Sequence, residues 1–103
     1  MTSLFELLPM LRDRVPWLPL GVLPTSVEPA SAVLRACDLP GELWLKRDDL
    51  SSPVYGGNKL RLLEHLLAAA KGQGASEVYS TGAIGSNFAL ATALHAPRAG
   101  LEP

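Results

Sequence analysis

The sequence predicts an α/β fold with an incomplete parallel sheet and flanking helices. Helix-like and strand-like segments alternate along the chain in the order helix, strand, helix, strand, helix, which is typical of this class. The two expected strands cover residues 42–47 and 77–81, and each leads through a turn into a helix. Two strands are few for a parallel sheet, whose faces are both normally covered by helices, so the sheet is expected to be incomplete.

Length and composition narrow the classes of function. A chain of 103 residues is one domain at most, and a net charge of −1 gives no reason to expect nucleic acid or an anionic membrane as a partner. No apolar run approaches the roughly 18 residues of a membrane span, and no basic segment of a signal peptide precedes the first leucines. We therefore expect a cytoplasmic protein. The single cysteine, Cys37, has no partner at metal-ligand spacing; we expect a buried hydrophobic side chain and no metal site.

The first part of the chain is expected to form two short helices. Ser3 is a candidate N-cap for a helix over residues 4–13, with Glu6 as its capping-box partner. Prolines then enforce an extended chain, and a second short helix is expected over residues 30–37.

Two aspartates, Asp48 and Asp49, end the first expected strand. Aspartates after a strand commonly form hydrogen bonds with nearby backbone groups in a loop. We favour this interpretation over acid–base catalysis, which is the alternative for a carboxylate pair.

The turn over residues 53–61 contains the first chemical motif. Gly56 and Gly57 allow a sharp turn or the close approach of a ligand, and Asn58 is a good helix N-cap. The helix is expected to end at Lys71, and its apolar residues recur at helical spacing at Leu60, Leu63, Leu67 and Ala70.

Lys59 therefore lies where this turn becomes a helix. The positive end of the helix dipole disfavours the ammonium form there. The neutral amine is the form that condenses with an aldehyde to give a Schiff base. The alternative is an ordinary solvated lysine.

The second motif is Thr-Gly-Ala-Ile-Gly-Ser-Asn at residues 81–87, a loop between a strand and a helix that is expected to reach Ala96. Backbone N–H groups at a helix start attract anions, and a substrate carboxylate would suit that place. The alternative is that Ser86 or Asn87 only caps the helix. A nucleotide-binding module is a weaker alternative, because the loop matches neither dinucleotide-binding nor P-loop patterns.

Three blocks, residues 44–50, 55–59 and 81–87, occur in an order and spacing that resemble the 1-aminocyclopropane-1-carboxylate (ACC) deaminase and D-cysteine desulfhydrase family. These pyridoxal-phosphate enzymes belong to the tryptophan synthase beta-like group, fold type II. The resemblance covers residues 23–96. It implies that Lys59 holds pyridoxal 5′-phosphate and acts as the catalytic base. It also implies that Ser86 assists proton transfer at the substrate and that Asn87 donates a hydrogen bond to the cofactor's phenolic oxygen.

The same resemblance implies a substrate class and a larger protein. The expected reaction is the deamination or lysis of a small amino acid, of the ACC or D-cysteine type, to a 2-oxo acid and ammonia. The family's phosphate-binding loop lies downstream of the matching blocks, so residues 1–103 are expected to be one amino-terminal fragment of an enzyme that is a homodimer at full length. The family usually has a polar residue at the position of Phe88, and this departure leaves the identity of the substrate open. The alternative is a catalytically inactive fragment or an interaction module.

Overall fold

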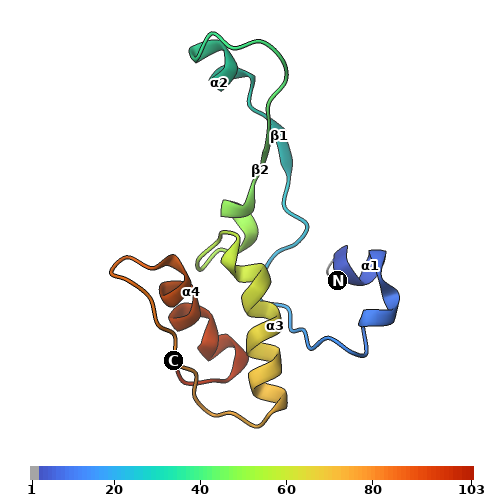
Figure 1. Cartoon of the computed structure of the whole chain (residues 1–103), viewed down its shortest axis with the longest axis vertical. Coiled ribbons are helices and arrows are strands. Elements are labelled where there is room, and N and C mark those ends of the chain that lie inside the picture. Colours follow the sequence, from blue (N-terminus) through green and yellow to red (C-terminus); the bar gives the residue numbers. More distant parts are fainter. Residues whose placement is uncertain (1–2) are drawn as a thin grey trace.

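The computed structural model describes residues 3–103, which form a body of helices with a narrow arm projecting from it (Figure 1). Helix α3 is the longest element and runs through the body, while a hairpin-like segment extends away from its N-terminal end. The elements, in chain order, are α1 (Ser3–Leu7), η1 (Pro9–Leu11), β1 (Val27–Pro29), α2 (Ser31–Ala36), β2 (Trp44–Lys46), η2 (Asp48–Ser51), α3 (Lys59–Gly72), α4 (Asn87–His95) and η3 (Ala96–Ala99).

The hydrophobic core lies along one face of α3. Leu60, Leu63 and Leu67 are at most 2 % exposed, which confirms the helical spacing expected from the sequence. Against them pack residues from the extended segment before β1, from α4 and η3, and from the end of the chain: Leu20, Ala91, Ala96, Ala99 and Leu101. The core therefore fixes α4 beside α3, and these two helices begin at the two sequence motifs.

The strand pairing differs from the parallel sheet that the sequence predicts. β1 and β2 pair antiparallel, with Val27 opposite Lys46 and Pro29 opposite Trp44. A parallel pair needs a crossover whose helix covers the sheet, because parallel sheets bury both faces. Every residue of β2 is exposed, so no helix among residues 3–103 covers this pair, and the chain returns alongside β1.

The second expected strand, residues 77–81, is reduced to one parallel bridge between Glu77 and Glu102. The N–H of Val78 donates to the carbonyl of Glu102, and the N–H of Glu102 donates to the carbonyl of Ser76, each at 2.8 Å. Parallel pairing is thus present here, between residue 77 and the segment after Leu101. Pro103 has no N–H with which to extend the ladder.

The helix ends show where local signals were correct and where they were not. The helix expected over residues 4–13 is divided, because Pro9 stops α1 and begins η1. The side chain of Ser3, its expected cap, lies outside the described residues. Asn58 precedes α3 but is itself in helical conformation and makes no side-chain cap. Gly74, at φ +79°, follows the C-cap of α3, which extends one residue past the expected Lys71 to Gly72. Cys37, which was expected to be buried, is exposed.

Candidate functional site

The turn before Lys59 is folded onto the short helix η2. The N–H of Gly57 donates to the carbonyl of Asp48 at 2.6 Å and to the hydroxyl of Ser51 at 3.0 Å. Ser51 is fully buried and donates in turn to the Asp48 carbonyl at 2.7 Å. A Cβ on Gly56 would lie 2.0 Å from the carbonyl oxygen of Asp49, so this close approach requires glycine.

Asp48 also anchors the first turn of α3 through its side chain. Its carboxylate accepts from Arg61 at 2.8 Å and from the Thr25 hydroxyl at 3.2 Å, and the ammonium of Lys46 donates to the Thr25 carbonyl. The hydrogen bond from Arg61 holds the pKa of Asp48 below its usual value. The contacts of Asp48 are those of a structural anchor, but its carboxylate binds the side chains of Arg61 and Thr25 rather than the nearby backbone groups expected from the sequence.

Lys59 is the first residue of α3 and is exposed. Its neighbour Leu60 is buried in the core, so the backbone at this position is well fixed. Within the described part of the chain, the Lys59 amine makes no hydrogen bond and no ion pair. The amine is therefore accessible to a small molecule with a carbonyl group.

Ser86 lies at the N-cap of α4, and its hydroxyl oxygen accepts from the N–H of Ala89 at 3.3 Å. The capping alternative left open by the sequence is thus observed. Gly82 packs directly on this side chain, since a Cβ there would lie 2.4 Å from the Ser86 hydroxyl oxygen. Capping uses only an acceptor site of Ser86 and leaves its O–H as a donor.

Tyr55 joins the two motifs. Its hydroxyl donates to the amide oxygen of Asn87 at 2.9 Å, across 32 residues of sequence. In this arrangement the amide NH₂ of Asn87 remains a donor, with no acceptor among residues 3–103. The described structure contains no direct hydrogen bond from Lys59 to Ser86 or to Asn87, so Tyr55 provides the link between these groups.

Nothing in the sequence indicates that His95 contacts this site. His95 is fully buried at the end of α4, and its Nε2 lies 2.9 Å from the carbonyl oxygen of Tyr55. The two residues are 40 positions apart, and a lone histidine on a helix carries no local signal of such a contact. His65 instead contacts the carbonyl of Pro16 through Nδ1 at 2.8 Å.

Phe88 follows Asn87 but packs toward the core rather than standing apart from it. It lines a hollow of about 140 Å³ between α3 and α4 together with Leu63, Val78, Ser80 and Thr92. The Ser80 hydroxyl is buried there and has no hydrogen-bond partner among the described residues. Phe88 thus makes the wall beside the second motif apolar.

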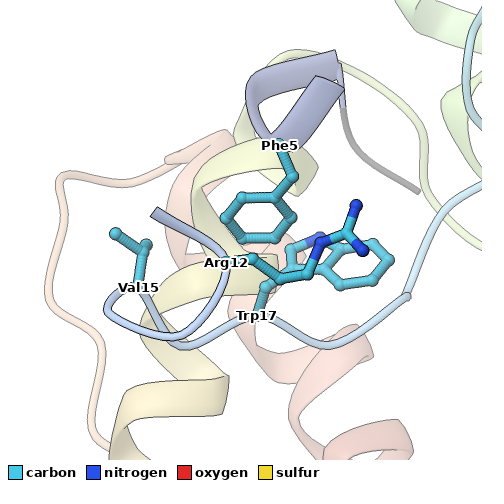
Figure 2. A pocket seen from close by; sticks show the side chains of 4 residues that line it. All are labelled: Phe5, Arg12, Val15 and Trp17. Carbon is cyan, nitrogen blue, oxygen red and sulfur yellow. The ribbon is translucent and has the colours of Figure 1, made fainter. Parts of the chain in front are cut away.

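A second hollow, of about 390 Å³, lies by the first residues of the chain (Figure 2). It is lined by Phe5, Arg12, Val15 and Trp17, and the rings of Phe5 and Trp17 meet edge to face at 6.0 Å. None of these residues belongs to the two motifs, so the hollow is separate from the candidate site. No helix within residues 3–103 has the length and apolar character needed to cross a membrane.

Comparisons with known proteins agree with the α/β class and with the resemblance seen in the sequence. No protein-family model matches the chain. It is 44 % identical over 88 residues to nocardicin C-9′ epimerase of Nocardia uniformis subsp. tsuyamanensis, covering 85 % of this chain and 25 % of the relative. It is 44 % identical over 90 residues to a D-cysteine desulfhydrase of Salmonella paratyphi A, covering 86 % and 26 %.

The fold is similar to the crystal structure of an ACC deaminase homologue, with a TM-score of 0.79 and 35 % identity. This match covers 98 % of the chain but 29 % of the solved protein. The chain thus spans about a quarter of the length of the curated relatives named above. The antiparallel hairpin and the single parallel bridge are therefore compatible with a partial α/β fold.

Proposed function

Because the chain is related in sequence and in fold to D-cysteine desulfhydrases and ACC deaminase homologues, we propose that it forms the amino-terminal part of a pyridoxal-phosphate enzyme. The reaction would be the deamination or lysis of a small amino acid of the ACC or D-cysteine type, giving a 2-oxo acid and ammonia. One observation carries this proposal: Tyr55 links the turn that presents the accessible Lys59 amine to Asn87 in the second motif. The full-length enzyme would be a homodimer, as the family resemblance implies.

The donor groups of the site fit pyridoxal phosphate. Its aldehyde requires a primary amine, and the Lys59 amine makes no contact with a charged or polar group among residues 3–103. Its phenolic oxygen requires a donor, which the amide NH₂ of Asn87 supplies, since Tyr55 occupies the amide oxygen. When bound, the cofactor supplies an electron sink for the carbanion formed at the substrate α-carbon.

The side chains would then divide the remaining work. Lys59 would hold the cofactor and serve as the general base that moves protons at the substrate. Ser86 would give or take a proton through its free O–H, while its oxygen keeps the cap on α4. The N–H groups of Asn87 and Phe88 have no acceptor in the described chain, and they would bind the substrate carboxylate at the start of α4.

A second candidate function is supported by the similarity to nocardicin C-9′ epimerase. An epimerase also removes a proton from carbon, but returns it on the opposite face instead of expelling a leaving group. Lys59 and Ser86, the residues proposed to move protons, would serve either elimination of a leaving group or epimerisation. Ammonia release from D-cysteine or ACC, against inversion of an amino-acid stereocentre without ammonia, distinguishes the two activities.

The alternative of an inactive fragment or interaction module rests on the quarter of the relatives' length that the chain spans. It differs from the enzyme proposal in one measurable way. In an inactive fragment that keeps the cofactor site, pyridoxal phosphate would label Lys59 but no substrate would be turned over. In an interaction module, pyridoxal phosphate would not label Lys59 selectively.

The test is reductive labelling of the purified chain with pyridoxal phosphate and borohydride, followed by peptide mapping. We expect an absorbance band and a reduced adduct on Lys59 that are both lost in Lys59→Ala. Lys71→Ala is the matched control, since Lys71 is an exposed lysine at the other end of α3. Equal labelling of Lys59 and Lys71 would contradict a cofactor site at the turn.

A further inference from the structure

Tyr55 is held at both of its polar ends by one helix. Its hydroxyl donates to Asn87, the first residue of α4, and its carbonyl oxygen contacts His95, the last residue of α4. Both distances are 2.9 Å. The helix therefore holds the tyrosine that stands four residues before Lys59, and the relative placement of the two motifs depends on these two hydrogen bonds.

The contacts of His95 define which of its nitrogens carries the proton. Its Nδ1 lies 3.4 Å from a guanidinium nitrogen of Arg98, which also donates to the carbonyl of Leu20 at 2.6 Å. A guanidinium is only a donor, so Nδ1 of His95 accepts and Nε2 bears the hydrogen. The Nε2–H then donates to the carbonyl of Tyr55, and both ring nitrogens of this buried side chain are satisfied.

The turn between Tyr55 and Lys59 needs such an anchor. Gly57 adopts φ +118°, and the two adjacent glycines give the turn wide conformational freedom. On its far side the turn is held by the bonds of Gly57 to Asp48 and Ser51. On its near side the bond from His95 fixes the backbone at Tyr55.

We propose that His95 is a positioning residue for Lys59. Its Nε2–H fixes the Tyr55 carbonyl and so limits the conformations of the turn that presents the amine. This inference rests on the proposed function only in so far as Lys59 is the cofactor lysine. The anchoring of the turn itself is a property of the chain without any cofactor, which allows the two to be tested separately.

The experiment compares the wild-type chain with His95→Gln, His95→Asn and His95→Leu. Glutamine can place an amide N–H near the position of Nε2, asparagine is too short to reach the Tyr55 carbonyl, and leucine has no donor. His65→Leu is the matched control, because His65 also contacts a backbone carbonyl but lies away from the turn. The first readout is amide hydrogen exchange at Gly57 relative to Leu67, which lies in the buried middle of α3.

We expect exchange at Gly57 to become roughly tenfold faster in His95→Leu and His95→Asn, as the loss of one buried hydrogen bond implies. Exchange at Leu67 should change much less, and His95→Gln and His65→Leu should resemble the wild type. The second readout is the rate of reductive labelling of Lys59 with pyridoxal phosphate, which should fall by a similar factor in the first two variants and recover in His95→Gln.

Unchanged Gly57 exchange in both the leucine and the asparagine variants would overturn the inference. Equal acceleration at Gly57 and Leu67 would also overturn it, because His95 would then support the whole fold rather than the turn. If His95→Leu does not fold, the pair His95→Asn and His95→Gln decides. If the wild type gives no selective Lys59 adduct, the proposed function fails, while the exchange ratio still decides whether His95 anchors the turn.

Discussion

The carboxylate of Glu64 is buried in α3 and receives three hydrogen bonds from one extended segment. Trp17 donates through its indole N–H at 2.8 Å, and the backbone N–H groups of Leu20 and Gly21 donate at 2.9 and 3.0 Å. A buried charged group is stable only when its acceptor sites are filled in this way. A single residue thus fixes the segment before β1 against the helix that carries Lys59.

Glu64→Ala should lower the free energy of unfolding by about 3 kcal/mol, because it leaves three donors without their acceptor at a site that is 2 % exposed. The measurement is urea unfolding followed by circular dichroism. The matched control is Glu42→Ala, whose exposed carboxylate also accepts from an indole N–H, at 3.4 Å, and should cost less than about 0.5 kcal/mol. Similar losses in both variants would contradict the role assigned to Glu64.

Gly82→Ala tests the packing of the second motif on its capping serine. The added Cβ would lie 2.4 Å from the Ser86 hydroxyl oxygen and 2.5 Å from its Cβ, so the cap must move, at a cost of about 1–3 kcal/mol. Thermal unfolding measures the change. At Gly72 a Cβ meets nothing within 4 Å, and Gly72→Ala should instead stabilise α3 by about 0.5–1 kcal/mol. If Gly82→Ala leaves the stability unchanged, the loop can open without loss of folding free energy.

At the scale of elements, the ion pair between Asp48 and Arg61 joins η2 to the first turn of α3. The hydrogen bond from Arg61 lowers the pKa of Asp48 below its ordinary 3.8. A carboxylate with a lowered pKa stabilises the fold fully above its unfolded pKa, near 4, and loses this contribution as the pH falls through the lower folded pKa. The ion pair that joins η2 to α3 is therefore expected to weaken below pH 4.

Asp48→Asn should lower stability at pH 7 and make the stability flatter between pH 4 and pH 2 than in the wild type. Chemical unfolding at a series of pH values measures both effects. Asp13→Asn is the control, since Asp13 is exposed and forms no ion pair within the described residues. An unchanged acid slope in Asp48→Asn would mean that the ion pair contributes nothing in this pH range.

Elements that depend on local periodicity could be predicted from the sequence, and those that depend on distant partners could not. The spacing of Leu60, Leu63 and Leu67 was enough to place α3 and its buried face. The direction of β1 relative to β2 depends on how the chain returns after α2, which no local pattern encodes. Pro9 breaks the helix expected over residues 4–13, whereas the leucines on either side of it continue the helical spacing and favour one unbroken helix.

The candidate site divides in the same way. Lys59, Ser86 and Asn87 lie in motifs that can be read from the sequence. Their roles remain predictions, and reductive labelling tests that of Lys59. In the sequence, Tyr55 is only one residue of the first motif and His95 is an isolated histidine, so neither shows its contact partner. Tyr55 contacts Asn87 across 32 residues and His95 across 40 residues, so only the fold brings these residues together.

At the scale of the whole molecule, the chain is extended for its length. Its radius of gyration is 16.6 Å, and its dimensions are 53 × 38 × 20 Å. A compact domain of this length would have a radius of gyration of about 13 Å. The difference arises from the arm of β1, α2 and β2, which projects from the body (Figure 1).

The arm exposes apolar side chains that an isolated hairpin cannot bury. Val27, Leu43, Trp44 and Leu45 are between 40 and 58 % exposed, and they lie on or beside its two strands. Clustered apolar surface of this kind marks a site of interaction or of aggregation. The purified chain should therefore bind a hydrophobic dye and associate as its concentration rises.

The double substitution Leu43→Gln and Leu45→Gln separates this surface effect from stability. Dye emission and the mean mass in sedimentation velocity should both fall, because two exposed apolar side chains of the arm are replaced by polar ones. The free energy of unfolding should change by less than about 0.5 kcal/mol per site, since neither residue belongs to the buried core. Leu62→Gln is the control, being 50 % exposed on α3 and distant in sequence from the arm. If the control reduces association as much as the double variant does, the body rather than the arm is the surface through which the chains meet.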